Sequence, residues 1–443
     1  MNWLDGRHGD RRARLAYCLN LHAADTLDDT IAGIRAVTLP LRDRLARGRR
    51  FGVGLYLPAS VALPLAAHDG ARDLERFAAF LADQALDPFT FNAFPFGGFH
   101  SSGLKAGVFA PTWEQRERVE FTLAVARIAA ALARACGGLH APAHVSISTH
   151  SGRFGAFALD PPDERDVESA RRCAENMARV VAELARIERE HGLRVILALE
   201  PEPRASSGDL AALAKFLQRA WSWGEALLVR ENGIAREAAP ERMRRHLGTC
   251  LDCCHAAVEF ERDAVERYTS AGGALGKLQF SSALAVRRPG EDRAARDALL
   301  ALDEPRYLHQ VTGSRDRATV RADDLPELRN ALAGGASPWT SCGEWRCHFH
   351  VPVDLERVSP GESGETGATG GGLFTTRDDA DRILAQCLAL ERWNPPELHV
   401  EIETYTWDIL PGAARGSGAL VDGLEREYAH VMDELARAGF HRE

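Results

Sequence analysis

Acidic side chains stand at the ends of several short apolar segments of this sequence. The clearest examples are Glu200 in VILALE, Asp252 in LGTCLD and Glu403 in HVEIET. Because carboxylates buried together repel one another, such a set requires a proton or a cation among them. Oxygen ligands joined by one histidine or amide suit Mn²⁺, Mg²⁺ or Co²⁺, whereas a larger share of histidine favours Zn²⁺. The residue types therefore predict a divalent-cation site, provided that the fold brings these segment ends together.

Short apolar segments alternate with long amphipathic ones along the whole chain, and this pattern is typical of βα units around a parallel sheet. The amphipathic stretches carry apolar residues three and four positions apart, as helices do. The segments that we interpret as strands are residues 16–22, 51–57, 89–94, 145–150, 195–200, 247–252, 276–282, 345–351 and 399–404. The pattern predicts an α/β fold in which residues 1–443 form a single domain, a TIM (β/α)8 barrel.

A (β/α)8 barrel has places for eight strands, and the sequence offers one candidate more. We expect WRCHFHV, residues 345–351, to be the extra strand, paired with RYLHQV, residues 306–311, in an excursion after the seventh barrel strand. Such an excursion, between about residues 306 and 352, would bring His350 over the mouth of the barrel. The alternative is that residues 51–57 lie outside the barrel.

On most of the predicted strands one face is polar and the other is apolar, because side chains of a strand alternate between its faces. A barrel collects the inward faces of all its strands, and its active site lies at their C-terminal ends. Glu401 lies deeper on such a face, where we expect it to pair with Lys277 or Arg346. We expect a substrate at the mouth to contact Asn20, His22, Asn92, His150, Lys277, His309, His348 and Trp407.

The cluster of Cys250, Cys253, Cys254 and His255 invites interpretation as a zinc site. Strand alternation argues against it, because alternation sends Cys253 to the opposite side from Cys250 and Cys254, and no second cysteine pair follows at ligand spacing. The chain has 9 cysteines, an odd number without a framework spacing. This usage indicates free thiols in a reducing compartment.

Composition and charge exclude several classes of protein. The net charge of −9 argues against a nucleic-acid partner, because binding to a phosphate backbone depends on basic surface. No apolar run of roughly 18 residues or more occurs, so we expect no membrane span. The basic N-terminal stretch has no apolar region behind it, which favours a cytoplasmic protein. The glycine-rich stretch at residues 359–372 predicts a flexible surface loop.

Several motifs together resemble the EboE family of metabolite traffic proteins, which belongs to the xylose-isomerase-like TIM-barrel superfamily. They are ALEPEP (198–203), LDCCHAAV (251–258), GKLQFSSAL (276–284), HFHVPV (348–353) and VEIETYTWDILP (400–411). The resemblance covers nearly the whole chain, and it implies a barrel of the xylose-isomerase-like type. In that superfamily a glutamate, an aspartate, a histidine and a final glutamate hold the metal.

The residues that match these four metal positions are Glu200, Asp252, Gln279, which replaces the histidine, and Glu403. Gln279 could bind through its amide oxygen, or His350 or His309 could reach in instead. His255 matches the D-x-x-H pattern of the superfamily and would be a ligand or a substrate contact. The implied cofactor is a divalent cation, namely Mn²⁺, Mg²⁺, Co²⁺ or Zn²⁺.

The resemblance also implies a reaction, the isomerisation or epimerisation of a small polyhydroxylated metabolite with Glu200 and Glu403 as acid and base and His255 beside them. The EboE family is associated with delivery of a secondary-metabolite precursor, so other proteins of the same metabolite traffic cluster are expected partners. One alternative is a binding and handover barrel without catalysis, which Gln279 favours. Another is a phosphodiesterase similar to endonuclease IV, against which the acidic balance and the missing histidine argue.

Overall fold

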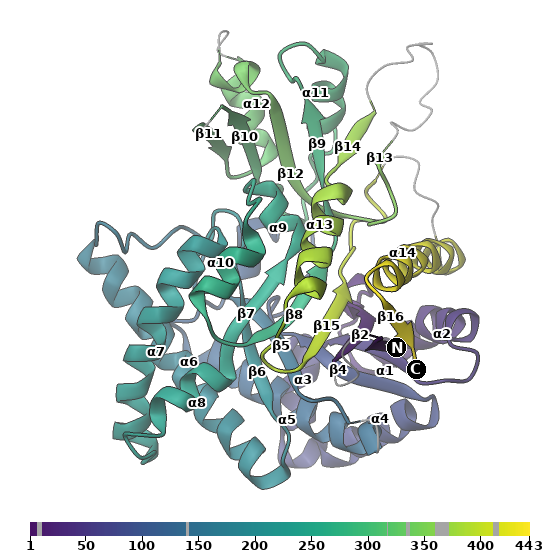
Figure 1. Ribbon diagram of the computed structural model, residues 1–443, viewed down its shortest axis with the longest axis vertical. Helices are drawn as coiled ribbons and strands as arrows, with labels where there is room; N and C mark the ends of the chain where they lie inside the picture. The colour runs from purple at the N-terminus through teal and green to yellow at the C-terminus, as the bar shows by residue number, and fades with distance from the viewer. Residues whose placement is uncertain (7–10, 139–140, 317, 334–336, 359–371, 411–415) are drawn as a thin grey trace.

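The computed structural model describes residues 1–6, 11–138, 141–316, 318–333, 337–358, 372–410 and 416–443. At its centre lies a curled row of eight parallel strands (Figure 1). In spatial order they are β2 (Arg12–Tyr17), β15 (Glu397–Ile402), β8 (Leu275–Phe280), β7 (Leu247–Asp252), β6 (Val195–Glu200), β5 (Val145–His150), β4 (Leu86–Asn92) and β3 (Phe51–Tyr56). A parallel bridge between Cys18 and Gly54 joins the two ends of the row. The predicted (β/α)8 barrel is therefore confirmed.

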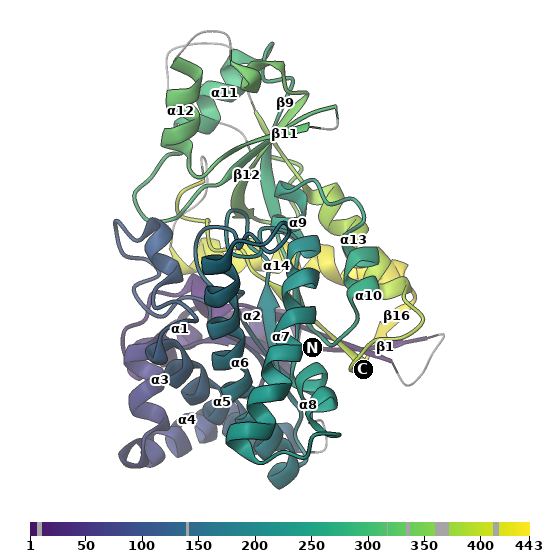
Figure 2. The ribbon, with the colours of Figure 1, turned by 90° about the vertical axis from the view of Figure 1, so that its left-hand side faces the viewer.

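Helices cover the outside of this barrel and alternate with its strands (Figures 1 and 2). Local sequence explains where they begin and end. In the longest helix, the Asp163 side chain caps the N-terminus by accepting backbone N–H groups, and Gly192 ends it in the left-handed region at φ 68°. The helices of this layer are α1 (Leu27–Gly33), α2 (Leu39–Leu45), α3 (Ala59–Ala66), α4 (Ala71–Asp83), α5 (Arg116–Gly137), α6 (Glu164–His191), α7 (Leu210–Asn232), α8 (Ala239–His246), α9 (Cys253–Val258), α10 (Ala264–Ala271), α13 (Arg377–Ala389) and α14 (Ser417–Arg437).

A second sheet projects from one end of the barrel (Figures 1 and 2). Its strands are antiparallel, and we call this region, from β9 to β14, the insertion. In spatial order the strands are β11 (Ala318–Ala322), β10 (Val311–Arg315), β12 (Glu344–Val351), β9 (Ser282–Arg287), β14 (Leu373–Thr375) and β13 (Arg357–Val358), with helices α11 (Arg293–Leu300) and α12 (Leu325–Ala333) beside them. The insertion has its own hydrophobic cluster, which is separate from the large cluster between barrel strands and helices. It includes Leu284, Trp345 and Phe349.

The insertion follows the seventh barrel strand, β8, as expected, and β12 is the extra strand. Two details differ from the prediction. The insertion begins at Ser282 rather than near residue 306, because only Ser281 separates β8 from β9 and the chain runs directly out of the barrel. In addition, β12 pairs with β9 and with β10, and β10 begins only at Val311, so most of RYLHQV is not a strand. Of the predicted flexible loop, residues 359–371 lie outside the described residues.

Below the mouth, ion pairs fill the barrel interior. Arg14 contacts Asp87 at 2.7 Å and Glu397 at 2.9 Å. The Lys277 ammonium pairs with Glu401, as predicted, and also donates to the Phe91 carbonyl at 3.1 Å. A Cβ atom at Gly54 would lie 2.0 Å from Glu401 Oε1, so only glycine leaves space for this carboxylate. The lower interior is a closed and charge-paired core.

The terminal segments extend the barrel sheet by two antiparallel strands, β1 (Asn2–Asp5), which pairs with β2, and β16 (Phe440–Arg442), which pairs with β1. All nine cysteines are buried free thiols, in agreement with the sequence-based prediction. Among the helices of the described chain, none has the length and apolar character that crossing a bilayer requires.

Candidate active site

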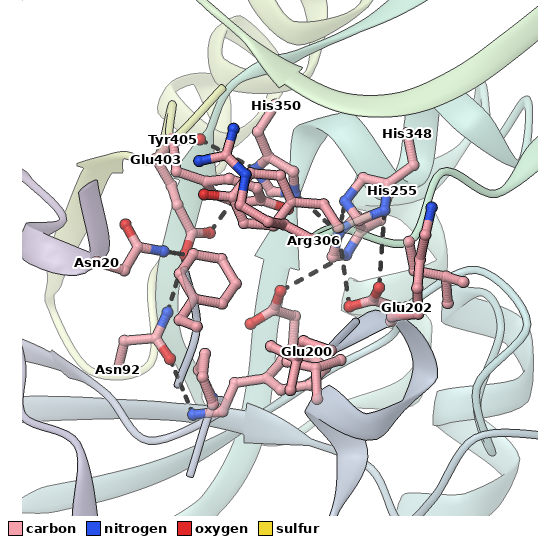
Figure 3. Close-up of a pocket in the computed structure, with 18 residues that line it drawn as sticks. Asn20, Asn92, Glu200, Glu202, His255, Arg306, His348, His350, Glu403 and Tyr405 are labelled. Atoms are coloured by element: carbon pink, nitrogen blue, oxygen red, sulfur yellow. Dashed lines mark hydrogen bonds and ion pairs between the residues drawn. The ribbon is translucent and has the colours of Figure 1, made fainter. Parts of the chain in front are cut away.

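A pocket lies where the C-terminal ends of the barrel strands meet the insertion (Figure 3). The barrel, its strand ends and the loop after β4 provide one part of the wall, and the insertion provides another. Its polar lining consists of Asn20, Asn92, Lys105, Glu200, Glu202, His255, Arg306, Tyr307, His348, His350, Glu403 and Tyr405. The sequence predicted seven of these twelve residues as site residues, and the structure brings those seven together here: Asn20, Asn92, Glu200, His255, His348, His350 and Glu403.

Glu403 follows β15 and is held by two amides. Asn20 Nδ2 and Asn92 Nδ2 each donate to Glu403 Oε1 at 2.8 Å. Asn92 is itself oriented, because its Oδ1 accepts the backbone N–H of Phe94 at 2.9 Å. The other carboxylate oxygen, Glu403 Oε2, is buried and has no hydrogen-bond partner among the described residues. One oxygen therefore fixes the carboxylate, and the second is available to a ligand.

Glu200 and Asp252 end the neighbouring strands β6 and β7. Asp252 Oδ1 caps helix α9 by accepting the backbone N–H of His255 at 2.7 Å, while Asp252 Oδ2 has no hydrogen-bond partner in the described chain. Glu200 Oε1 lies 3.6 Å from His255 Nδ1, and Glu200 Oε2 likewise has no partner there. Both acids thus present a buried, unpaired oxygen.

Burial raises the pKa of Glu200 and the pKa of Glu403 well above the ordinary value of a glutamate, and neighbouring carboxylates raise both further. For Glu200 the largest such neighbour is Glu403. Burial also raises the pKa of Asp252. In the described chain no lysine or arginine forms an ion pair with these three acids. Three unpaired oxygens on mutually repelling acids require a compensating proton or cation. For Asp252 the nearby groups include His255 and His350, since an oxygen of Asp252 and one ring nitrogen of each lie within 4.8 Å of one another.

Gln279 fits that cation less well as it is placed. It lies in the barrel interior, where its Oε1 accepts the Cys250 thiol at 2.7 Å and its Nε2 is buried without a partner among the described residues. A half-turn of the amide would exchange these two atoms. Of the predicted metal ligands, the three acids therefore lie at the C-terminal strand ends, and the Gln279 amide lies below them in the barrel interior.

Three histidines meet on the other side of the pocket (Figure 3). His255 Nε2 lies 3.1 Å from His348 Nε2 and 3.1 Å from His350 Nε2. Burial lowers the pKa of His255 to about 3 and that of His350 to about 4, and it lowers the pKa of His348 well below its usual value. All three imidazoles are therefore neutral near pH 7.

The argument from alternation against a cysteine-containing zinc site does not hold in the structure. Strand β7 ends at Asp252, and Cys253 and Cys254 belong to helix α9, where alternation does not apply. The Cys254 thiol and one ring nitrogen each of His348 and His350 lie within 4.8 Å of one another. Cys250, by contrast, lies in the barrel interior beside Gln279.

Five predicted substrate contacts lie outside this pocket. Lys277 is committed to Glu401 deep in the barrel. His150 packs between Phe94 and Phe109 with ring centroids 5.1 and 5.5 Å away. The other three predicted contacts, His22, His309 and Trp407, also have surroundings of their own.

His309 stacks on Phe349 within the insertion, at 3.8 Å between ring centroids, so it neither lines the pocket nor reaches the acids. His22 and Trp407 line a separate surface groove beside the mouth. Strand alternation predicts which face a side chain occupies, but it does not predict which rings pack around His22, His309 and Trp407.

Sequence analysis missed five polar residues of the pocket, namely Lys105, Glu202, Arg306, Tyr307 and Tyr405. Of these, Glu202 is the acid. It lies two residues beyond Glu200 in the segment EPEP, and its carboxylate accepts Gln310 Nε2 at 2.9 Å. Burial raises its pKa to about 8. The signal was present, because an acid so close to the end of a barrel strand reaches the same mouth as the strand's last residue.

No protein-family model matches the chain, and no curated protein matches it in sequence. Three solved structures share some of its backbone arrangement. A 3-keto-D-glucoside 4-epimerase from E. coli is 16% identical over 60% of this chain and 79% of its own, with a TM-score of 0.32. A D-psicose 3-epimerase solved in the presence of D-fructose is 10% identical over 95% and 99%, with a TM-score of 0.40. A xylose isomerase domain-containing protein from Salmonella typhimurium LT2 is 9% identical over 95% and 97%, with a TM-score of 0.39. The strand order therefore defines the fold, and the function has to be argued from the site.

Proposed function

We propose that this protein is a metal-dependent isomerase or epimerase that moves a proton next to the carbonyl group of a small polyhydroxylated metabolite. The observation that supports this most is the pair of buried glutamates, Glu200 and Glu403, each with one unpaired carboxylate oxygen at the same mouth. Burial raises the pKa of Glu200 and the pKa of Glu403 well above the ordinary value of a glutamate, and perturbed acids in a pocket are typical of proton-transfer sites.

The surroundings of the two glutamates suggest different roles. Two amide N–H groups hold Glu403 Oε1, and such bonds favour the ionised carboxylate, so Glu403 is the candidate base. Glu200 accepts no hydrogen bond at Oε2, and the charge of Glu403 favours its protonated form. Glu200 is therefore the candidate acid, which returns a proton to the neighbouring carbon or oxygen.

A divalent cation held by Glu200, Asp252 and Glu403 would supply Lewis-acid polarisation of adjacent substrate oxygens. The chain's own contribution is to orient Glu403 through Asn20 and Asn92 and to cover the mouth with the insertion. Exclusion of water strengthens the electrostatic interactions at such a site.

The pocket favours a neutral, hydroxyl-rich substrate over a polyanion. Its two lysine and arginine side chains are already paired, Lys105 with Asp324 at 2.8 Å and Arg306 with Asp408 at 2.6 Å. Three acids, Glu200, Glu202 and Glu403, stand in the same lining. This charge distribution disfavours a phosphodiester substrate.

A binding and handover barrel without catalysis is the second candidate. Gln279 favours it, because its amide oxygen is engaged by Cys250 rather than directed to the acids. The part in delivery of a secondary-metabolite precursor, together with partners from the same metabolite traffic cluster, remains an expectation from the resemblance to the EboE family.

Solvent-proton exchange tests the proposed reaction. The protein, loaded with Mn²⁺, Mg²⁺, Co²⁺ or Zn²⁺, is incubated in D₂O with a panel of ketoses, aldoses and cyclitol ketones, and deuterium next to the carbonyl is followed by mass spectrometry. Glu200→Gln and Glu403→Gln should each lower the exchange rate by about 10²–10⁴-fold, the usual contribution of a general acid or base.

Glu261→Gln provides the matched control. Glu261 is also a buried acid, with a pKa that burial raises to about 8, but it accepts the backbone N–H of Leu210 at the start of α7 and does not line the pocket. Its substitution should leave exchange unchanged. Absence of exchange with every compound, in protein that binds metal and a member of the panel, would favour the handover barrel instead.

A further inference from the structure

We propose that His255, His348 and His350 form a second metal centre, which takes a cation of the Zn²⁺ class. It adjoins the carboxylate centre, because an oxygen of Asp252 and one ring nitrogen each of His255 and His350 lie within 4.8 Å of one another. This inference does not depend on the proposed reaction, because it concerns what the three imidazoles bind and not what the pocket converts. It rests on the direction of their ring nitrogens, on the groups behind them and on the backbone at His350.

The distances between the ring nitrogens match those of ligands around one ion. His255 Nε2 lies 3.1 Å from His348 Nε2 and 3.1 Å from His350 Nε2. Imidazole nitrogens bind zinc at about 2.0–2.1 Å in tetrahedral geometry, which places neighbouring ligand nitrogens roughly 3.3 Å apart. A small outward movement of the rings would admit the ion.

The contacts among these nitrogens are not hydrogen bonds, because the protons are on the opposite side of each ring. His255 Nδ1 faces the Pro201 carbonyl at 2.9 Å. His350 Nδ1 lies 3.0 Å from the Glu403 carbonyl and 3.0 Å from the Ser281 hydroxyl, which can accept as well as donate. A carbonyl oxygen only accepts, so each Nδ1 carries the ring proton and each Nε2 presents a lone pair. Two lone pairs at 3.1 Å repel each other unless a cation lies between them.

His348 obeys the same rule through Gln310. Its Nδ1 lies 2.6 Å from Gln310 Oε1. The amide orientation is determined by the other end, because Gln310 Nε2 donates to Glu202 Oε1 at 2.9 Å and to the Pro203 carbonyl at 3.0 Å. His348 Nδ1 is therefore the donor and its Nε2 is the third lone pair. Metal-binding histidines commonly donate their second nitrogen in this way.

The backbone at His350, one of the three histidines of this centre, is strained. His350 has a φ of 33°, which non-glycine residues rarely adopt, and the pairing register of β12 shifts between Cys347 and Val351. Strain of this kind persists where the surrounding structure demands it and concentrates at functional sites.

A fourth ligand is within reach. Glu202 Oε2 lies 3.9 Å from His255 Nε2, and an oxygen of Glu202 and one ring nitrogen each of His255 and His348 lie within 4.8 Å of one another. Three neutral imidazoles and one carboxylate constitute a nitrogen-rich set that favours Zn²⁺ over Mg²⁺ or Mn²⁺.

Another buried group of His144, Glu397 and His399 shows why proximity alone is insufficient. Its carboxylate is already neutralised by Arg14 at 2.9 Å, and His144 Nε2 contacts the Gly276 carbonyl at 2.8 Å, so this nitrogen is a donor and not a ligand. The pocket histidines differ because their converging nitrogens are all acceptors.

Zinc stoichiometry tests the second centre. Protein stripped with a chelator is titrated with Zn²⁺ alone, desalted and measured by elemental analysis, beside His348→Asn/His350→Asn and Glu200→Gln/Glu403→Gln. Asp252 is left intact, because it also lies near His255 and His350. Asparagine tolerates a positive φ, so the histidine variant keeps the backbone at residue 350. Wild type should hold two equivalents, and each double variant should hold one.

His430→Asn is the control, because His430 belongs to a half-buried group with Asp381 and Glu434 on the helix layer and should not change the count. A wild-type count of one that only the histidine variant loses would support the histidine centre and reject the carboxylate centre. An unchanged count in the histidine variant, or a single equivalent lost in both double variants, would overturn a separate histidine centre.

X-ray absorption of wild-type protein loaded with one equivalent of Zn²⁺ needs no variant. Three imidazole nitrogens at about 2.0–2.1 Å are expected around the metal. An oxygen-only first shell would overturn the proposal even if a variant failed to fold.

Discussion

The acids inside the barrel and the acids at its mouth differ in one respect, which is the presence of a cationic partner. Below the mouth, Lys277 pairs with Glu401, and both side chains are fully buried. At the mouth, Glu200 and Glu403 are almost as deeply buried, but in the described chain no lysine or arginine pairs with them. Equal burial with unequal pairing separates structural acids from acids kept for a ligand.

The two arrangements follow from what each region must do. A charge pair in a closed interior is stabilised only when both partners are present, so the lower barrel is complete in itself. Unpaired acids destabilise the fold and persist where a ligand or a reaction requires them. This comparison predicts opposite effects for substitutions that otherwise look alike.

The largest effect is expected from Lys277→Met. This change leaves Glu401 buried without its cation, and it should lower the free energy of unfolding by about 3–5 kcal/mol. Denaturant unfolding of chelator-treated protein measures the loss. Lys277→Met/Glu401→Gln is the control, and it should recover part of the loss because no buried charge remains unpaired. A loss below about 1 kcal/mol would contradict the structural role of the pair.

Metal addition should act on the mouth alone. A ligand that binds only the folded protein stabilises it by about 2.7 kcal/mol at a free concentration one hundred times its dissociation constant. Thermal or denaturant unfolding with and without Mn²⁺ or Zn²⁺ measures this gain. Asp252→Asn, which removes a charge with little change of shape, should reduce the gain. An equal gain in that variant would place the cation elsewhere.

Glu200→Gln in metal-free protein should raise the free energy of unfolding, whereas Lys277→Met lowers it, and the change should be smaller. The substitution removes a carboxylate that repels Glu403, so the free energy of unfolding should rise by on the order of 1 kcal/mol while metal affinity falls. Denaturant unfolding compared with metal titration separates the two effects. A destabilisation similar to that of Lys277→Met would show that Glu200 belongs to the structural core.

Sequence reasoning predicted the acids at the mouth because two local rules suffice for them. Strand alternation assigns a face, and the end of a parallel strand assigns a height in the barrel. These rules placed Glu200, Asp252 and Glu403 at the C-terminal ends of their strands, and Glu200 and Glu403 line the pocket. They also explain the pairing of Lys277 with Glu401 below.

The same rules fail where geometry depends on distant segments. His348 and His350 come from an insertion, and their meeting with His255 requires a register shift in β12 and a positive φ that no local pattern reveals. His309 shares that sequence neighbourhood but stacks on Phe349 instead. The cysteine argument failed for a related reason, since it extended a strand into a helix.

The smallest effect is expected at the rim, where pairing occurs but burial does not protect it. Arg306 contacts Asp408 at 2.6 Å, with side chains 23% and 54% exposed, so water screens this pair. Arg306→Gln should lower the free energy of unfolding by about 0.2–1 kcal/mol, and the difference should shrink further as salt increases. The loss caused by Lys277→Met should persist at high salt, because ions do not enter the closed interior. Unfolding of both variants at low and high ionic strength measures the contrast, and a salt-sensitive loss at Lys277 would contradict a closed lower barrel. An ion pair therefore indicates a structural role only when both partners are buried. Buried acids without a cationic partner, in contrast, indicate a ligand site.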